Sequence, residues 1–453
     1  MEGPPMTSTL EALTQALLSA AAKAGADAAD AIAVDGTSVS IDVRQGRLEQ
    51  AERSEGIDIG LRVLIGQRQA CVSSSDTRPE TLAAMAERAV AMAREAPEDP
   101  TIGLADPSQL TQSWDLATLE LADETPEPSA AALQEDARRA EAAALAIAGI
   151  SQVESAGAGY GRRNIHLAAS NGFSGGYTRT SRALSCVAIT GTGTGMERDG
   201  YGDSRTFQAD LFDPETIGRT AAERTLARAG ARKPKTGAYP VLYDERVAAS
   251  LIGHLLSAIN GSAIARGASW LRDAMGEQVL PSGLTLTENP LRPRASASRP
   301  FDAEGLPSRT RDIVANGILT GWTLDLATAR KLGLTSTGNA TRGTSSPPSP
   351  AASNMALTQG THSRDDLIRE MGTGLLITSM IGSSINATTG DYSRGASGFW
   401  VENGAIAYPV NECTVAGNLR DMLMRLTPAN DARLYLGTVV PSLLVEGLTL
   451  AGE

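Results

Sequence analysis

The three histidines of the chain are the first candidates for catalysis or metal binding. His166, His254 and His362 are widely spaced, and none lies in an HExxH, HExxxH or HxH arrangement. His254 lies in LIGHLLSAIN, which predicts a helix; helical zinc proteases need a glutamate beside the first histidine and a second histidine about one turn later. Leu255 takes the glutamate position, and residues 257–259 supply no second ligand. The pattern predicts a packed helix histidine and leaves His254 as a weak metal candidate.

Serine, cysteine and glycine motifs give no catalytic set either. GFSGG (172–176) resembles the serine region of trypsin-type proteases, but the cysteine content and residue order of that class are missing. Cys413 falls where alternation predicts a strand, so a buried apolar role is expected. GAGYG (157–161) and GTGTG (191–195) resemble pieces of a phosphate-binding loop, but neither is GxGxxG between a strand and a helix. We expect turns at all three glycine-rich segments.

Composition excludes several classes of function. The 453 residues include 52 acidic and 40 basic side chains, a formal net charge of −12 with no basic block, which disfavours a nucleic-acid partner. Cys71, Cys186 and Cys413 form no CxxC pair, which favours a reducing cytoplasm. The start, MEGPPMTS, lacks the basic and apolar regions of a signal peptide, and no apolar run reaches the ~18 residues of a membrane span.

The elements that must position any site divide into two halves. Before residue 232, a helix, a group of β-rich stretches and a helix occur twice, separated by an acidic, proline-rich loop at 97–129, which suggests an internal duplication. ARKPKTGAYP (231–240) is the best boundary. We therefore expect one domain over residues 1–232 and a second over 238–453.

The second half is dominated by short strands and turn signals. Its Ser/Thr/Pro/Gly-rich segment 335–356 is expected to be a mobile surface loop. The predicted fold class is α+β, with an N-terminal α/β-type domain of helices and β-meanders and a C-terminal, mainly-β, barrel-like domain.

One long segment of the second half, DYSRGASGFWVENG (391–404), points to a family. Together with RPFDAEG (299–305), MGTGLLITSMIG (371–382) and NECTVAGNLRDM (411–422), it resembles the TldD/PmbA family, once called modulators of DNA gyrase. Within that family it is more similar to the PmbA branch, also called TldE. The resemblance is dense over residues 240–453 and looser before them.

The resemblance implies a cytoplasmic, heteromeric metallopeptidase. In that family the TldD subunit binds zinc through an HExxxH helix and a later cysteine, and TldE shares the fold without those ligands. The complex encloses a channel for unfolded peptides and is linked to modified microcin precursors and an antitoxin. Here the corresponding helix has His254 followed by Leu-Leu-Ser-Ala-Ile, and Cys413 lies earlier than the ligand cysteine would. We expect no cofactor in this chain and zinc in a TldD-type partner.

The signature segment supplies the candidate peptide-binding or structural residues. Gly395 and Gly398 suit a bent or bulged strand, and Asn403–Gly404 suits a type I′ turn. The residues that could bind a peptide backbone or brace the turn, with bracing favoured, are Asp391, Tyr392 and Arg394. Exposed strand edges in this glycine-rich domain could accept an extended peptide by strand addition.

Three functions remain open at this stage. The leading hypothesis is a non-catalytic subunit that holds unfolded peptides for a TldD-type zinc subunit. The first alternative is an independently active, divergent metallopeptidase that uses His254 with acids such as Asp244 or Glu245. The second alternative is a non-catalytic, peptide-binding homodimer. None of the three requires a nucleic acid or a membrane.

Overall fold

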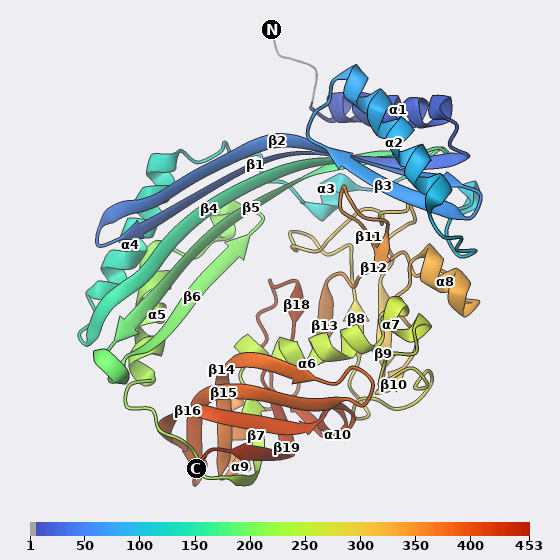
Figure 1. Ribbon diagram of the computed structural model, residues 1–453. Coiled ribbons are helices and arrows are strands. Elements are labelled where there is room, and N and C mark those ends of the chain that lie inside the picture. The colour runs from blue at the N-terminus through green and yellow to red at the C-terminus, as the bar shows by residue number, and fades with distance from the viewer. Residues whose placement is uncertain (1–5) are drawn as a thin grey trace.

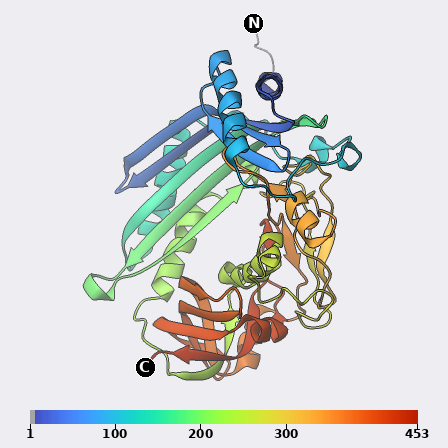
Figure 2. The same ribbon diagram turned by 45° about the vertical axis from the view of Figure 1, so that its right-hand side comes forward.

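The computed structural model describes residues 6–453, which form a ring (Figures 1 and 2). An arched sheet from the N-terminal half makes one side of the ring, and a β-barrel from the C-terminal half lies opposite. Short strands and loops of residues 260–360 complete the ring between them. The first five residues, part of the start for which no signal peptide was predicted, lie outside the described residues. None of the described helices is long and apolar enough to cross a bilayer.

The arched sheet contains six strands in the order β3-β2-β1-β4-β5-β6. Its first half consists of α1 (Met6–Ala24), β1 (Ala28–Arg44), β2 (Arg47–Ile65), β3 (Arg68–Ser74) and α2 (Pro79–Glu95). Its second half consists of α4 (Ala130–Leu145), β4 (Ile150–Ala169), β5 (Ser174–Thr190), β6 (Glu197–Arg205) and α5 (Pro214–Ala227). The connection contains only η1 (Pro107–Gln109) and α3 (Leu116–Leu119). The predicted repeat of helix, strands and helix is therefore present; a common origin of the two halves stays a prediction.

All four long helices of this half cover the convex face of the arch (Figure 1). In β2, Ile59, Leu61 and Val63 alternate toward the core under α1 and α2, which leaves the residues between them on the concave face. In β4, Ala156, Ala158 and Tyr160 pack against α4 and α5 in the same way. One face of the sheet is buried by helices and the other faces the interior of the ring.

The glycine-rich segments meet different fates in this sheet. Residues 157–161 lie in the middle of β4, paired with both β1 and β5, so the turn predicted there is wrong. Glycines at alternate positions leave the backbone of the concave face without side chains. The same glycine-rich pattern is typical of turns, which is why a turn was predicted. The predicted turns at Gly172, between β4 and β5, and at η2 (Gly193–Gly195), between β5 and β6, are confirmed.

The C-terminal half contains a closed five-stranded barrel. Its strands are β7 (Gly237–Tyr243), β14 (Gly374–Ile385), β15 (Asp391–Glu402), β16 (Ala405–Asn418) and β19 (Leu443–Ala451), with β17 (Leu426–Pro428) added beside β19. Residues 414–416 of β16 pair with residues 449–451 of β19 and close the cylinder. The predicted barrel-like, mainly-β domain is confirmed. The closure pairs each of the five barrel strands on both sides over part of its length, and β17 has a neighbour on one side only; peptide addition at a strand edge of this domain stays a prediction.

Short elements surround the barrel. A second sheet has the order β10-β9-β8-β13-β18. Its strands are β8 (Leu286–Glu288), β9 (Arg311–Ala315), β10 (Ile318–Leu319), β13 (Met355–Leu357) and β18 (Thr438–Val439). The helices are α6 (Glu245–Ala258), α7 (Gly261–Ala265), α8 (Leu326–Leu332), α9 (Arg364–Met371) and α10 (Leu419–Met424); η3 (Gln208–Asp210) precedes α5. No helix or strand covers residues 228–236, and the predicted division into residues 1–232 and 238–453 stays a prediction.

The segment 335–356 is not the surface loop that its composition predicts. Asn339, Ala340, Asn354 and Met355 are each at most 2% exposed. A short hairpin of β11 (Ala340–Thr341) and β12 (Ser349–Pro350) holds the segment in place. Polar residues are buried here because buried partners satisfy them; for example, Asn339 donates to Glu288 Oε1 at 2.7 Å.

The tip of this segment rests directly on the arched sheet. A Cβ added to Gly60 of β2 would lie 2.1 Å from the Thr344 carbonyl oxygen, so only glycine allows the loop to approach this closely. Gly56 lies on the same face of the same strand and has nothing within 4 Å of such a Cβ. The contact between Thr344 and β2 therefore depends on Gly60, whereas Gly56 takes no part in it.

We expect Gly60→Ala to destabilise the protein by about 1–3 kcal/mol, the cost of overpacking a close contact. Gly56→Ala is the matched control and should be neutral or slightly stabilising, because Ala loses less backbone entropy than Gly on folding. Urea denaturation of both variants and the unchanged chain checks this. Equal midpoints for the two variants would contradict the docking of Thr344 on Gly60.

Candidate functional site

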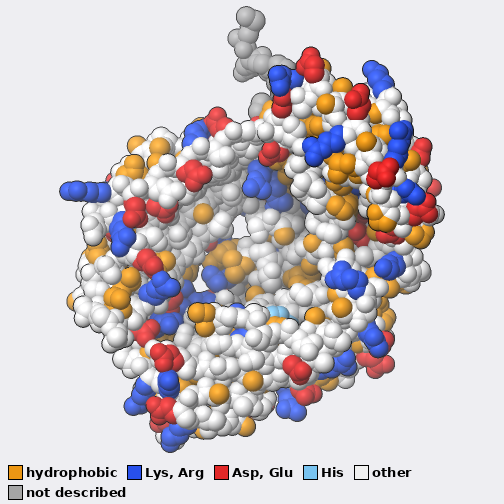
Figure 3. Space-filling view, in the orientation of Figure 1, with side chains coloured by type: hydrophobic (Ala, Val, Ile, Leu, Met, Phe, Trp, Pro, Cys, Tyr) orange, Lys and Arg blue, Asp and Glu red, His pale blue; other side chains and the backbone are white. Residues whose placement is uncertain are grey.

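The interior of the ring is an open channel beneath the concave face of the arch (Figure 3). Two cavities of about 590 Å³ and about 1030 Å³ line it, and they share Arg163, Arg179 and Ser296. Gly159 and Gly161 of β4 contribute bare backbone to the larger cavity. The space beneath the arch is wide because small residues occupy the side of the sheet that carries no helices.

The walls of the two cavities are rich in arginine, although the chain carries a net charge of −12, and four of these arginines, Arg205, Arg294, Arg342 and Arg433, are ion-paired. Three aspartates line them, Asp203, Asp210 and Asp302. Eight arginines line them, namely Arg163, Arg179, Arg205, Arg292, Arg294, Arg299, Arg342 and Arg433. Their positions in the chain span some 270 residues, so no basic block marks them in the sequence. A chain with a net negative charge therefore gathers several of its arginines around the channel.

A buried ionic cluster closes the ring beside the smaller cavity. Asp30 of β1 accepts a hydrogen bond from Arg62 Nε of β2 at 2.7 Å and also pairs with Arg342 from the opposite half. All three side chains are at most 4% exposed. Burial is the main cause that lowers the pKa of both guanidinium groups, which shows how fully they are removed from water.

Two further carboxyl groups lie next to this cluster. Asp302 accepts backbone hydrogen bonds from Leu306 at 2.9 Å and Ala340 at 3.1 Å. Glu304 accepts one from the Leu326 N–H at 2.9 Å, at the start of α8. Burial, followed by the nearby carboxylates of Asp302 and Asp325, raises the pKa of Glu304 to about 8.

The signature segment forms strand β15 of the barrel, and its glycines and turn residues determine the shape of that strand. Cβ atoms at Gly395 and Gly398 would lie 2.6 Å from Ile381 Cγ2 and 1.9 Å from the Leu376 carbonyl oxygen, and the β15–β16 register shifts beside Gly398. The bulged strand is thus confirmed. The type I′ turn is confirmed too, because Asn403 and Gly404 have φ of 52° and 73° between paired residues 402 and 405.

The polar signature residues contact their own barrel. Asp391 accepts hydrogen bonds from Thr389 Oγ1 at 2.6 Å and Asn418 Nδ2 at 3.2 Å, which lower the pKa of its carboxyl group. Arg394 Nε donates to the Gly382 carbonyl oxygen at 2.8 Å, and Tyr392 is 2% exposed. These contacts are bracing contacts. That the same residues also touch a peptide stays a prediction; Asp391 and Tyr392 do line a shallow depression at this end of the hairpin.

His254 lies on α6, half-buried, with its ring edge-on to Tyr392 at 5.8 Å between centroids. Burial lowers the pKa of its imidazole, so the neutral ring is favoured. Its Nε2 atom is buried without a hydrogen-bond partner among the described residues. The fold therefore presents one imidazole nitrogen at this position.

Asp244 and Glu245 do not converge on that nitrogen. They lie at the first turn of α6, about 14 Å along the axis from His254 at ~1.5 Å per residue. Asp244 pairs with Arg246 and Arg364, and Glu245 pairs with Arg433. In the part of the chain that the structure describes, no three His, Cys, Asp or Glu side chains are grouped to hold a metal.

Comparison with known proteins assigns the chain as a whole. Domain models of the PmbA/TldA metallopeptidases match residues 29–93 (domain 1), 123–229 (central domain) and 236–452 (C-terminal domain). The "Metalloprotease PmbA" of Escherichia coli O157:H7 is 36% identical over 98% of this chain and 96% of its own length. The chain belongs to the PmbA/TldD metallopeptidase family. A PmbA homologue of Haemophilus influenzae is also 36% identical, over 96% of this chain and 94% of its own.

Solved structures of PmbA/TldD-type proteins share the whole ring. A "putative modulator of DNA gyrase" from Bacteroides thetaiotaomicron superposes with a TM-score of 0.90 at 27% identity, covering 98% of this chain and 99% of its own. TldE from Thermococcus kodakarensis superposes with a TM-score of 0.86 at 20% identity, covering 97% and 100%. The second likeness speaks for the fold alone. The resemblance inferred from residues 391–404 is confirmed.

The zinc that a PmbA/TldD metallopeptidase implies does not fit the residues around His254. One buried imidazole nitrogen is available, and the neighbouring positions carry Leu255, Ser257 and Ala258 rather than further ligands. Cys413 is buried in the barrel, with its thiol directed to the Ala396 carbonyl oxygen at 3.2 Å. Burial raises the pKa of that thiol to about 11, which opposes the thiolate that zinc requires.

Sequence reasoning missed the arginine-lined channel. A usable signal was the two-residue period of small residues in GAGYG and of polar residues in the neighbouring strand, which marks one face of a sheet rather than a turn. The arginines contributed by the loops at 292–299 and by Arg433 had no such signal, because tertiary contacts alone bring them to the sheet.

We expect the free energy of unfolding of this protein to fall as the pH rises toward the raised pKa of Glu304. Its folded pKa of about 8 lies above the ordinary 4.5, so the stabilisation is complete below about pH 4.5 and is lost as pH rises through about 8. Glu304→Gln keeps a carbonyl for the Leu326 N–H and removes the titration. Thermal denaturation at several pH values between 5 and 9 gives the free energy of unfolding as a function of pH. Over this range, that free energy should fall by on the order of a few kcal/mol less in Glu304→Gln than in the unchanged protein.

The exposed carboxylate variant Glu277→Gln serves as the control and should keep the slope of the unchanged protein. Identical slopes for the unchanged chain and Glu304→Gln would show that the Glu304 carboxyl group is not held in its protonated form by the folded structure.

Proposed function

We propose that this chain is the non-catalytic, peptide-holding subunit of a PmbA/TldD-type zinc peptidase and works with a TldD-type subunit that supplies the metal. The observation that carries the proposal is the combination of a family fold built around a wide channel with a His254 helix that offers a single imidazole nitrogen. Unfolded or modified peptides are the substrates that such a channel admits.

The concave face supports the binding of an extended chain. Its floor at Gly159 and Gly161 exposes backbone rather than side chains, which suits substrates of varied sequence. The edge strand β6 pairs only with β5 in the sheet, and its residues 202–205 line the larger cavity. Main-chain hydrogen bonds from such an edge hold a peptide without reading its side chains. Strand addition is thus proposed for β6 in the arch.

A partner is part of the proposal because peptide hydrolysis needs an activated water. A zinc ion activates water when three protein ligands hold it and one position stays open. The described residues of this chain do not group three such ligands, so the ligand set is assigned to the TldD-type partner. The three thiols, Cys71, Cys186 and Cys413, are free, in keeping with the cytoplasmic location that we propose.

The two alternatives have less support. An independent metallopeptidase would require Asp244 or Glu245 to reach His254, and arginines hold both acids at the other end of α6. A peptide-binding homodimer would use the same channel without a partner enzyme, and no observation on the described surface favours it over the heteromer.

We expect hydrolysis of an unfolded peptide only when this chain and a TldD-type subunit are mixed, with zinc present. The chain alone should release no product above buffer and should retain no stoichiometric zinc after desalting. Peptide cleavage followed by mass spectrometry, together with metal analysis of each purified component, checks both statements.

His254→Ala separates this proposal from the independent enzyme. In the mixture, the variant should cleave as fast as the unchanged chain, because the imidazole holds no metal. Cleavage by the chain alone that is lost with chelator and with His254→Ala would establish the independent enzyme instead. Light scattering that shows only a self-dimer, with no stable complex in the mixture, would favour the homodimer.

A further inference from the structure

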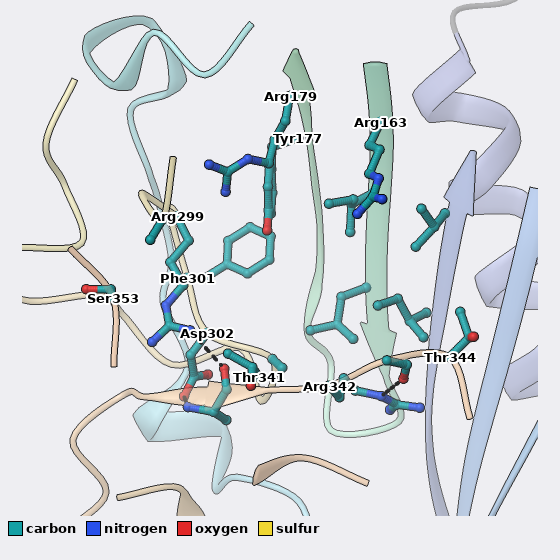
Figure 4. Close-up of a pocket in the computed structure, with 18 of the residues that line it drawn as sticks. Arg163, Tyr177, Arg179, Arg299, Phe301, Asp302, Thr341, Arg342, Thr344 and Ser353 are labelled. Carbon is teal, nitrogen blue, oxygen red and sulfur yellow. Dashed lines mark hydrogen bonds between the residues drawn. The ribbon is translucent and has the colours of Figure 1, made fainter. Parts of the chain in front are cut away.

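The smaller cavity differs from the rest of the channel in its chemistry. It lies between β4–β5 of the arch and three loop segments, 296–303, 340–344 and 352–353, and has a volume of about 590 Å³ (Figure 4). One part of its wall is apolar and comprises Ile32, Val34, Ile165, Leu167, Tyr177 and Phe301. The other part is formed by guanidinium groups.

Two of those arginines face each other across the sheet. Arg163 of β4 and Arg179 of β5 are directly paired in the antiparallel register and therefore share the concave face. Like charges in such a pair destabilise a sheet. Figure 4 shows both side chains leaving their strands on the cavity side, with the Arg179 guanidinium turned toward the segment of Arg299. Burial lowers the pKa of Arg179; Tyr177 acts in the opposite direction, and the charges of Arg163 and Arg299 add smaller lowering contributions.

The two members of the pair are held differently. Arg179 donates to the Ser298 carbonyl oxygen at 2.7 Å and to that of Ser296, which fixes its position. Arg163 is exposed to the cavity and has no hydrogen-bond or ion-pair partner among residues 6–453. Its charge is compensated by nothing that the described chain contributes.

Buried donors without partners line the same cavity. Arg299 is 8% exposed, and its Nε atom has no partner, although its terminal nitrogens donate weakly to carbonyl oxygens at 3.3–3.4 Å. The Ser353 hydroxyl is likewise buried and unpartnered. An unsatisfied buried donor costs free energy, but both atoms are closed to the cavity, so neither is counted as a contact to a ligand there.

Acidic side chains contribute little to the wall of this cavity. Asp302 is its one acidic lining residue, and backbone N–H groups of Glu304, Leu306 and Ala340 already occupy its carboxylate. Arg342 also lines the cavity, but it is paired with Asp30. The site thus combines an unpaired arginine, Arg163, with an apolar wall and a single acidic lining residue that is already occupied.

We propose that this cavity binds a carboxylate of the peptide held in the channel, with Arg163 as the cation that holds it. Guanidinium groups bind carboxylates in a planar, two-point geometry. The apolar wall, including Tyr177 and Phe301, receives the side chain next to that carboxylate. The inference rests on the proposed peptide-holding function and adds that this subunit recognises a carboxylate of its peptide, terminal or side-chain.

The test is the affinity of the purified chain for matched fluorescent peptides, followed by anisotropy. Four peptides of one apolar sequence are compared: free or amidated at the C-terminus, each with or without one internal glutamate replaced by glutamine. We expect loss of the recognised carboxylate to raise Kd at least about tenfold, the scale of one charge-assisted contact. The arm that shows the loss tells whether the terminal or a side-chain carboxylate is bound.

Arg163→Gln is the decisive variant, and Arg162→Gln is its matched control. Arg162 is the next residue of β4, projects from the opposite face of the sheet and lines neither cavity. Arg163→Gln should weaken binding of the carboxylate peptide about tenfold and abolish the difference from the neutral peptide. It should also raise the melting temperature slightly, because it relieves the repulsion with Arg179. A merely structural arginine would lower the melting temperature instead.

The outcomes separate this inference from the proposed function. Equal affinity for all four peptides, or equal effects of Arg163→Gln and Arg162→Gln, would overturn the carboxylate site even if the mixture with a TldD-type subunit cleaves peptide. A selective loss with Arg163→Gln would support the site even if no such cleavage were found.

Discussion

The ring depends on one buried ionic contact between the two halves of the chain. Asp30 in the first strand of the arch accepts from Arg62 of the next strand and from Arg342, which the C-terminal half inserts into the sheet. Breaking a buried pair by removing one partner is strongly destabilising, because it leaves an uncompensated charge away from water. The loop that carries Arg342 is therefore fixed on the sheet, and Gly60 provides the space beneath it. The loop 340–344, one wall of the smaller cavity, is positioned by that contact.

The second constraint is the one-sided covering of the arch. Helices bury one face of the sheet, and small residues such as Gly159 and Gly161 keep the other face free of side chains. The result is a long channel floor that a second layer of structure does not fill. Arginines placed on that floor and on the loops opposite make the channel basic inside an acidic protein. Such a field favours anionic ligands within the channel.

Local sequence patterns predicted the helices, strands and turns of the chain better than they predicted how these elements pack together. The repeated order of helix, β-rich stretches and helix and the Asn403–Gly404 turn are confirmed, because periodicity and turn chemistry act within a few residues. The residues 157–161 and 335–356 were misjudged for one shared reason. Small and polar residues indicate turns and exposed loops in isolation, but here neighbouring strands pair with the first and buried partners satisfy the second.

The sequence by itself determined the family, through the long segment at 391–404, and it determined that the His254 helix lacks the glutamate and second histidine of a zinc site. Both are properties of consecutive residues. Only the tertiary structure decided where charge accumulates. Arg163, Arg299 and Arg342 belong to three distant segments, and their meeting around one cavity is a consequence of β4–β5 pairing and loop docking. Electrostatic interaction depends on distance in space, which no spacing along the chain specifies.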